Sequence, residues 1–447
     1  MKKIVVIGAG PTGLSAAFRL RELGHENFVV YERNNYVGGL CKSFIDNHGF
    51  TWDLGGHVIF SHYEYFDRFL ETALGTEYLL HRRNTWIRTM GQWIPYPFQN
   101  NLQYLPRNVI AKCLKGLRKA DRGRKKTKNF EEWINATMGE GIAQYFMLPY
   151  NFKVWAYPLD QLSSSWIDER VSPVNLKETV SLLKSPAPKT DWGPNAAFKF
   201  PKNGGTGQIF NRIAKFFAAK IKLSSQLTKI DVESKKIYLA DGQCDTYDIL
   251  INTSPLDQFV ALLKPHSQEL IDIATGLKHN GVFIVGVGIK KPCPSDKSWN
   301  YFPDSNCPFF RVTYFSNYSP QNVPNVKEYY SLLCESAYSE YKKEDESEIV
   351  EKTIQGLINS GLISASDKRF IVSRFLFDIE YAYPVPTLER EDSLKRIQPA
   401  LQAMDIYSRG RFGAWKYEIG NTDHSVMQGK EIVDKILSQS NETVWEL

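Results

Sequence analysis

The chain has few cysteines, and they are not arranged for a disulfide framework or a zinc site. Its 447 residues include 6 cysteines, which are scattered along the sequence without a Cys-x-x-Cys pair. Metal-binding cysteines usually come in close pairs, and scattered thiols are typical of proteins from a reducing compartment. The sequence therefore predicts no metal site, no disulfides and a cytoplasmic location.

Long hydrophobic runs are also missing. The longest apolar stretches, such as residues 282–289, have the length of a strand, whereas a membrane helix needs about 20 apolar residues. The apolar run at residues 4–7 is too short for a signal peptide and leads directly into a glycine motif. We therefore expect neither a membrane span nor export.

The chain lacks a strong charge of either sign. Its formal net charge is +6, from 55 basic and 49 acidic residues, and the lysines are mostly dispersed, so we expect no nucleic-acid partner. A site for a dinucleotide and a diphosphate would favour such a small positive excess. One basic run, between residues 112 and 128, is interpreted as a solvated helical face or loop, with a partner surface as the alternative; it contains Lys115, Arg118, Lys119, Arg122, Arg124, Lys125 and Lys126.

A glycine motif stands near the N-terminus, between an expected strand (residues 3–7) and an expected helix (residues 11–23). The motif is Gly8-x-Gly10-x-x-Gly13, and only glycine lets the backbone turn tightly there and approach a pyrophosphate. Glu32 ends the next expected strand, residues 28–31, and is placed to accept a hydrogen bond from a ribose hydroxyl. Because the strand, the helix, the second strand and the acidic residue follow one another at the spacing of the known fingerprint, the motif predicts dinucleotide binding.

The segments after Glu32 favour FAD over NAD. Arg33 is followed by Gly38-Gly39-Leu40, by the aromatic Phe50 and Trp52, and by residues 53–57, Asp-Leu-Gly-Gly-His. This succession resembles the FAD oxidoreductase superfamily of amine oxidases and phytoene desaturases. Residues 227–255 resemble the second FAD segment of that superfamily, in which the backbone near Leu227 would contact the adenine.

Longer strings give a narrower resemblance. GGHVIFSHY (55–63), QWIPYPFQNN (92–101), PYNFKVW (149–155) and RGRFGAW (409–415) are uncommon sequences. They closely resemble UDP-galactopyranose mutases of the fungal and trypanosomatid type, as do residues 192–195, 308–311, 316–318 and 386–391. The resemblance covers nearly the whole chain, in order. Fungal members continue beyond the last expected helix (residues 425–439) with a tail that helps to build the oligomer, so the oligomeric state stays open.

The resemblance implies a redox-neutral flavin reaction. Reduced FAD would use its N5 as the nucleophile at the anomeric carbon of UDP-galactopyranose, and the sugar would reclose as UDP-galactofuranose. NADPH or NADH would serve only as the reductant of the flavin. The residues themselves reveal no Ser/His/Asp order, zinc spacing or obvious carboxylate pair that would provide a protein nucleophile.

The family match also assigns roles to individual residues. The resemblance implies that His57, Arg311 and Arg411 assist catalysis, since the histidine loop touches the flavin and the two arginines hold the diphosphate. Arg83 resembles an arginine near the flavin. The implied FAD contacts are Gly8, Gly10, Gly13, Glu32, Arg33, Gly39, Leu40, Gly55, Gly56, His57, Leu227, Gly420, Asn421 and Ser425. The implied UDP-sugar contacts are Tyr96, Phe98, Gln99, Asn151 and Trp155 for uridine, and Arg170, Asn195, Tyr301, Arg311, Tyr318, Tyr383, Arg411 and Tyr417.

Each of these residues also has a structural interpretation: an arginine can form a salt bridge, and a tyrosine can pack in a core. For the whole chain, three functional alternatives stay open: a mutase for another nucleotide sugar, an amine-oxidase-like oxidoreductase, and a non-catalytic nucleotide-sugar binder. The expected fold is α/β: a discontinuous Rossmann-like FAD-binding domain (residues 1–65, 200–270 and 390–447), a helical insertion domain (66–199) and an antiparallel β-sheet domain (271–389).

Overall fold

A computed structural model describes residues 1–121, 126–167, 170–184 and 187–447. Its N-terminal strand, β1, lies at the centre of a parallel sheet that is buried on both faces. Ile4 and Val6 point into one hydrophobic core, and Val5 and Ile7 point into the other, as expected for a strand without a polar alternation. The strand order is β20 (Ile406–Ser408), β13 (Ile249–Asn252), β1 (Ile4–Ile7), β2 (Phe28–Tyr31) and β9 (Ile221–Lys222).

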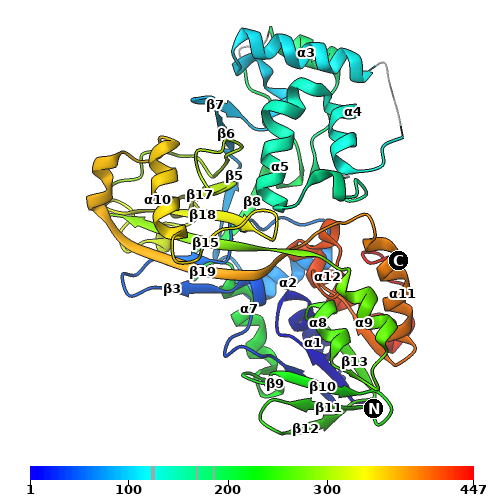
Figure 1. Cartoon of the computed structure of the whole chain (residues 1–447). Helices are drawn as coiled ribbons and strands as arrows, with labels where there is room; N and C mark the ends of the chain where they lie inside the picture. The colour runs from blue at the N-terminus through cyan, green and yellow to red at the C-terminus, as the bar shows by residue number, and fades with distance from the viewer. Residues whose placement is uncertain (122–125, 168–169, 185–186) are drawn as a thin grey trace.

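Helices cover the two faces of this sheet, at the lower end of the molecule in Figure 1. The core that contains Ile4 is completed by α1 (Pro11–Glu22), α2 (Glu64–Leu74), α7 (Gly207–Ala214) and α12 (Thr422–Ser438). The core that contains Val5 is completed by α8 (Leu256–Ala261), α9 (Gln268–Thr275) and α11 (Arg390–Gln402), and by a four-stranded sheet of β12 (Cys244–Thr246), β11 (Lys236–Leu239), β10 (Leu227–Asp231) and β14 (Leu263–Lys264).

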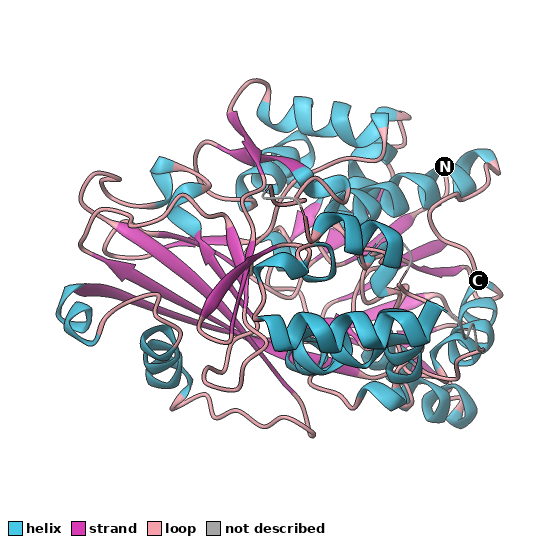
Figure 2. Ribbon diagram, turned by 90° about the horizontal axis from the view of Figure 1, so that it is seen from above, coloured by secondary structure: helices cyan, strands magenta, loops and turns pink. Residues whose placement is uncertain are grey.

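A seven-stranded sheet forms the second unit, and its long strands extend away from the helices of the first (Figure 2). In the strand β15 (His279–Ile289), a Cβ at Gly286 would lie 2.5 Å from the ring of Trp52, and a Cβ at Gly288 would lie 2.7 Å from the ring of Phe50. The two glycines therefore make room for the aromatic hairpin β3 (Ser43–Ile45) and β4 (Thr51–Asp53). The order is β19 (Ile371–Pro384), β15 (His279–Ile289), β18 (Tyr330–Tyr338), β17 (Arg311–Tyr314), β16 (Trp299–Tyr301), β6 (Trp86–Thr89) and β7 (Gln92–Pro95).

A helical unit stands above this sheet in Figure 1, and α10 (Ile349–Asn359) packs on the sheet face that points away from the Trp52 hairpin. Within the helical unit, a Cβ at Gly139 would lie 2.3 Å from the backbone of Gly116, so two helices meet there backbone to backbone. Its helices are α3 (Arg107–Asp121), α4 (Phe130–Ile142), α5 (Leu148–Trp155) and α6 (Leu176–Leu182).

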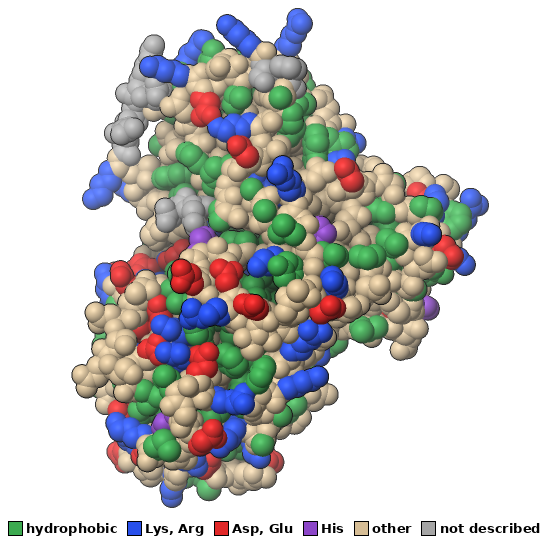
Figure 3. Space-filling model, turned by 180° about the vertical axis from the view of Figure 1, so that it is seen from behind, with side chains coloured by type: hydrophobic (Ala, Val, Ile, Leu, Met, Phe, Trp, Pro, Cys, Tyr) green, Lys and Arg blue, Asp and Glu red, His purple; other side chains and the backbone are tan. Residues whose placement is uncertain are grey.

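Basic side chains project from the end of the molecule that α3 forms, whereas both signs of charge mix over the opposite end (Figure 3). Of the basic run in the sequence, Lys115, Arg118 and Lys119 are exposed on α3. Arg122, Arg124 and Lys125 lie outside the described residues. Within the described part of the chain, no helix has the length and apolar character needed to cross a bilayer.

The predicted fold class is confirmed, with one parallel pair, β6 beside β16, in the otherwise antiparallel sheet. Residues 78–95 lie within the expected helical insertion domain (66–199), but the expectation of helices is wrong for this segment. There the buried Ile87 and Thr89 alternate with the partly exposed Trp86 and Arg88, and this period of two is typical of a strand. Three strands result: β5 (Tyr78–Arg82), which pairs with β8 (Ala197–Pro201), and the hairpin of β6 and β7.

Candidate active site

A cavity of about 530 Å³ opens at the carboxyl ends of the parallel strands β1 and β2. This is the edge of an open α/β sheet at which ligands commonly bind. Segments that are far apart in the sequence meet here, and most of the predicted FAD contacts line the cavity: Gly8, Gly10, Glu32, Arg33, Gly39, Leu40, His57, Leu227, Gly420 and Ser425.

The three motif glycines have different tasks. Gly8 has a φ of 98°, in the left-handed region that favours glycine. A Cβ at Gly13 would lie 1.9 Å from the carbonyl oxygen of Gly8, so glycine is needed there for helix α1 to approach the turn. Gly10 caps α1 without a side chain, which leaves the first amides of the helix and its positive dipole end open to a phosphate. Gly13 itself is not on the cavity wall.

Glu32 is buried at the end of β2, with 6% of its surface exposed. Its Oε2 accepts a hydrogen bond from the amide of Ala9 at 2.8 Å, and its Oε1 accepts one from the amide of Asn34 at 2.8 Å. The carboxylate is therefore fixed in place, and each oxygen keeps a second lone pair for a ribose hydroxyl. Together with the glycine turn and the open helix end, this geometry fits a dinucleotide such as FAD.

A second cavity, of about 250 Å³, joins the first. His57 and Arg411 line both cavities, together with Leu40, Leu54 and Thr422. Residues predicted from the sequence to bind FAD or the UDP-sugar meet on its wall: Leu40, Gly55, Gly56, His57, Tyr96, Arg170, Asn195, Tyr301, Arg311, Tyr383, Arg411, Tyr417 and Asn421.

Two arginines on this wall have only neutral hydrogen-bond partners among the described residues. Arg411 donates to the carbonyl oxygen of Gly420 at 3.1 and 3.0 Å and to that of Ala382 at 3.1 Å. Arg170 donates to Oδ1 of Asn421 at 2.7 Å. Since no carboxylate in the described part of the chain neutralises these guanidinium groups, the cavity is suited to an anion with more than one negative charge.

Arg311 differs from them because a carboxylate already binds it. Its Nε and Nη2 each donate to Glu335 at 2.5 Å, and Oε1 of Glu335 also accepts from the amide of Gly56 at 3.1 Å. Arg311 therefore forms a salt bridge through Nε and Nη2, which is the structural role considered for it above. Its third nitrogen, Nη1, makes no hydrogen bond to the described residues. Sequence reasoning missed Glu335, although the two side chains are direct neighbours across strands β17 and β18.

His57 lies where the two cavities meet. Its Nδ1 is buried and has no hydrogen-bond partner in the described part of the chain. Burial, together with the charges of Arg411 and Arg311, lowers the pKa of the imidazole to about 3. The ring is therefore neutral at physiological pH, which suits a hydrogen bond to a cofactor or substrate and does not suit an imidazolium acid.

Tyrosine rings form much of the remaining wall. Tyr96 contacts Tyr301 at a centroid distance of 5.2 Å, and Tyr383 contacts Tyr417 at 5.7 Å. Burial raises the pKa of Tyr383 to about 12, so its hydroxyl stays protonated and can donate to a phosphate or a sugar.

Several predicted UDP-sugar contacts lie off both cavity walls, within the described residues. Phe98 stacks on Phe146 at 4.9 Å, and Trp155 packs against Tyr417 at 4.8 Å, directly behind the wall. Arg83 is placed away from the cofactor cavity, where its guanidinium lies 5.1 Å from the ring of Tyr96 and binds Asn195. The predicted contacts in this buried layer are Phe98, Gln99, Asn151, Trp155 and Tyr318.

Other wall residues were missed by sequence reasoning. Thr422 and Asp423 stand at the start of α12, beside the predicted Asn421 and Ser425, so the expected helix start could have revealed them. Trp192 and Phe60 also line the second cavity, and both stand in strings that carry the family resemblance.

Comparison with known proteins extends these observations to the whole chain. The profile of the family described as flavin containing amine oxidoreductase matches residues 11–412. A crystal structure of reduced UDP-galactopyranose mutase is similar, with a TM-score of 0.96 and 42% sequence identity, over 99% of this chain and 96% of that chain.

More distant proteins share the fold or one segment. A putative protoporphyrinogen oxidase from Exiguobacterium sp. 255-15 has a TM-score of 0.74 and 16% identity, over 98% of this chain and 99% of that chain. The 4,4'-diapophytoene desaturase (4,4'-diaponeurosporene-forming) of Staphylococcus aureus (strain COL) is 46% identical over 76 residues, which are 17% of this chain and 14% of that protein. The match over nearly the full length and the geometry of the two joined cavities agree: the chain belongs to the flavin-containing amine oxidoreductase family and, within it, to the UDP-galactopyranose mutases.

Proposed function

We propose that the chain catalyses the redox-neutral interconversion of UDP-galactopyranose and UDP-galactofuranose. The observation that carries this proposal is the pair Arg170 and Arg411 on the wall of the second cavity, whose charges no described carboxylate neutralises; Arg411 also lines the dinucleotide cavity. A diphosphate is the part of a nucleotide sugar that such a pair would bind. When bound and reduced, FAD would provide the nucleophile for the anomeric carbon of the sugar through its N5.

The proposed FAD site uses the residues that line the first cavity. The amides at the start of α1 bind the pyrophosphate, and the fixed carboxylate of Glu32 accepts from a ribose hydroxyl. The backbone near Leu227 contacts the adenine. Gly420, Asn421 and the start of α12 would hold the pyrimidine edge of the flavin, where the helix dipole favours negative charge. NADPH or NADH serves as the reductant.

In the second cavity, the proposed role of Arg411, Arg170 and Nη1 of Arg311 is to bind the diphosphate. The same charges stabilise UDP as its bond to the sugar breaks, because negative charge then grows on the phosphate oxygen. Glu335 keeps Arg311 in position through its two hydrogen bonds.

The other wall groups orient the substrate and do not supply a nucleophile. The described wall of the second cavity has no serine, cysteine or lysine. Its two carboxylates are already bound, Glu335 by Arg311 and Asp423 by His62, and the proposal therefore leaves the covalent step to the cofactor. Neutral His57 and the hydroxyls of Tyr383 and Tyr417 form hydrogen bonds to the sugar and the phosphates. Tyr96 and the layer behind it, which includes Phe98 and Trp155, form the proposed uridine side of the site.

The test uses the FAD-bound protein, reduced anaerobically with dithionite and mixed with UDP-galactofuranose, with the products separated by chromatography. We expect UDP-galactopyranose to form without net oxidation, and we expect the activity to disappear when the flavin is oxidised. An absence of conversion, with the flavin still reduced in the same sample, would overturn the proposal.

The family match also favours a second candidate, an amine-oxidase-like oxidoreductase, because the matched profile is that of flavin containing amine oxidoreductases. Consumption of oxygen or NAD(P)H in proportion to product would identify such an enzyme. The charged wall of the second cavity argues against it, since arginines without a carboxylate partner favour an anionic substrate and repel a protonated amine.

A further inference from the structure

At the start of α12, two histidines and one aspartate converge from opposite ends of the chain. Nδ1 of His62 lies 2.6 Å from Oδ2 of Asp423, and Nδ1 of His424 lies 3.6 Å from Oδ1 of the same carboxylate. One ligand atom from each side chain lies within 4.8 Å of the other two. We propose that His62, Asp423 and His424 bind a divalent transition-metal ion of the Zn²⁺, Co²⁺ and Ni²⁺ class.

The burial of this cluster is the second observation that points to a ligand. The side chain of Asp423 is 1% exposed and that of His424 is 9% exposed. Nδ1 of His424 is buried and has no hydrogen-bond partner among the described residues. Buried polar atoms without a partner are uncommon, because each leaves a desolvation cost uncompensated. A cation between this nitrogen and the Asp423 carboxylate would satisfy both groups.

The arrangement of the rings also fits chelation. The ring centroids of His62 and His424 are 5.4 Å apart, and their planes differ by 25°. Both Nδ1 atoms lie near the same carboxylate, at 2.6 Å and 3.6 Å from its two oxygens. The carboxylate is held by the amides of His424 at 2.9 Å and His62 at 3.3 Å, which orients it as outer hydrogen bonds orient the ligands of known metal sites.

The donor set selects the type of metal. Two imidazole nitrogens and one carboxylate suit zinc, cobalt and nickel, whereas magnesium and calcium prefer oxygen ligands alone. Three protein ligands leave at least one coordination position for water or another ligand. Asp423 also lines the arginine-rich cavity, so the ion would lie at the edge of that cavity.

The experiment is a calorimetric titration of the FAD-bound protein with ZnCl₂, after a chelator has been used and removed. We expect one equivalent of Zn²⁺ to bind, and we expect His62→Ala and Asp423→Asn to weaken binding by at least about tenfold. His48→Ala is the matched control, since His48 is an exposed histidine outside the cluster. His62 lies on a partly exposed loop, so its variant remains informative even if changes at the buried His424 disturb folding.

A second readout identifies the ligands directly. Co²⁺ in place of Zn²⁺ gives ligand-field absorption bands, which become visible once the flavin is reduced and its own visible absorption is lost. We expect bands in the wild type and in His48→Ala, and none in His62→Ala. Absence of stoichiometric binding to the wild type, or equal binding to His62→Ala, would overturn the proposal.

Discussion

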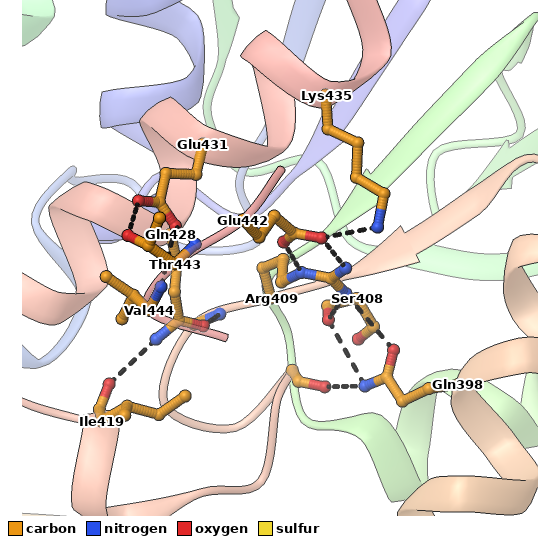
Figure 4. Close-up of polar contacts among 12 residues, drawn as sticks. Gln398, Ser408, Arg409, Ile419, Gln428, Glu431, Lys435, Glu442, Thr443 and Val444 are labelled. Carbon is orange, nitrogen blue, oxygen red and sulfur yellow. Dashed lines mark hydrogen bonds and ion pairs between the residues drawn. The ribbon is translucent and has the colours of Figure 1, made fainter. Parts of the chain in front are cut away.

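Arg409 and Arg411 are two residues apart in one loop, yet their environments are opposite. Arg409 is fully buried and is bound by the carboxylate of Glu442, with Nη2 at 2.7 Å from Oε2 (Figure 4). Its Nη1 donates to the carbonyl oxygen of Ser408 at 2.8 Å, and its guanidinium lies 3.4 Å from the ring centroid of Trp445. The guanidinium group of Arg409 therefore has all of these partners within the protein itself.

Arg411 has carbonyl oxygens as partners and lies on the wall of both cavities. Its orientation is fixed, but its charge is not neutralised by any described carboxylate. The comparison shows how one residue type serves two purposes: a carboxylate partner makes Arg409 part of the fold, and neutral partners keep the charge of Arg411 available for an anion.

The two environments are physically connected. Gln428, which is fully buried on α12, accepts from the amide of Gly410 at 2.8 Å and donates to the carbonyl oxygen of Ile419 at 2.9 Å. Gly410 precedes Arg411, and Ile419 precedes the Gly420 that Arg411 binds. Gln428, drawn in Figure 4 with the Arg409 ion pair, therefore anchors both the backbone before Arg411 and the backbone that Arg411 binds.

The largest expected effect is on stability, in Arg409→Ala. Removing the guanidinium leaves Glu442 buried without its main partner, so we expect the free energy of unfolding to fall by about 3–5 kcal/mol. Urea unfolding at saturating FAD measures the change, with Arg396→Ala as the control because Arg396 is in an exposed pair with Glu269. A loss as small as that of the control would show that the buried pair does not stabilise the fold.

We expect Arg411→Ala to reduce activity strongly and stability only a little, the opposite of Arg409→Ala. We expect kcat/KM with the reduced protein to fall by about 10²–10³-fold, the usual loss when a group that stabilises transition-state charge is removed. We expect a smaller loss of unfolding free energy than in Arg409→Ala. Turnover of UDP-galactofuranose and urea unfolding, measured on both variants, provide the comparison. If Arg411→Ala destabilised the protein as much as Arg409→Ala and kept its activity, the distinction between the two arginines would be wrong.

The Arg409 pair also predicts a pH dependence. Burial alone would raise the pKa of Glu442, but hydrogen bonds and charge from Arg409 and Lys435 lower it below its ordinary value of 4.5. A lowered folded-state pKa gives stability that is present above the unfolded pKa and is lost as the pH falls through the folded pKa. We expect Glu442→Gln to cost about 2 kcal/mol at pH 7 and to converge with the wild type below pH ~4. A difference that persisted at low pH would contradict this assignment.

Much of the fold could be predicted because local patterns and long-range packing agree. Residues 28–31 form a strand as expected, and the glycine motif forms the expected turn before α1. The segment at residues 78–95 was misjudged because strands of four or five residues in an aromatic-rich region carry little periodic signal. Its partners, β16 and β8, lie more than 100 residues away along the chain.

The site was less accessible from the sequence, because the partners of an ionised side chain depend on tertiary structure. Nothing local separates Arg409 from Arg411 in the string RGRFGAW, and only the family resemblance selected Arg411. The carboxylate that binds Arg311 belongs to Glu335, which lies on the adjacent strand. His62 and His424 meet only because the loop after Gly56 folds against the start of α12, so no spacing in the sequence indicates the cluster.

The smallest expected effect concerns the connection between the two arginines, in Gln428→Met. The substitution removes both hydrogen bonds of the amide while it keeps the approximate volume, so we expect a loss of about 1–2 kcal/mol of unfolding free energy. Because the backbone on either side of Arg411 then loses an anchor, we expect kcat/KM to fall by roughly tenfold, which corresponds to about 1.4 kcal/mol. The paired measurements are urea unfolding and turnover of UDP-galactofuranose, with Gln355→Met on α10, far from both cavities, as the control. A stability loss with unchanged kcat/KM would mean that Arg411 is positioned by Gly420 and Ala382 without help from the buried network.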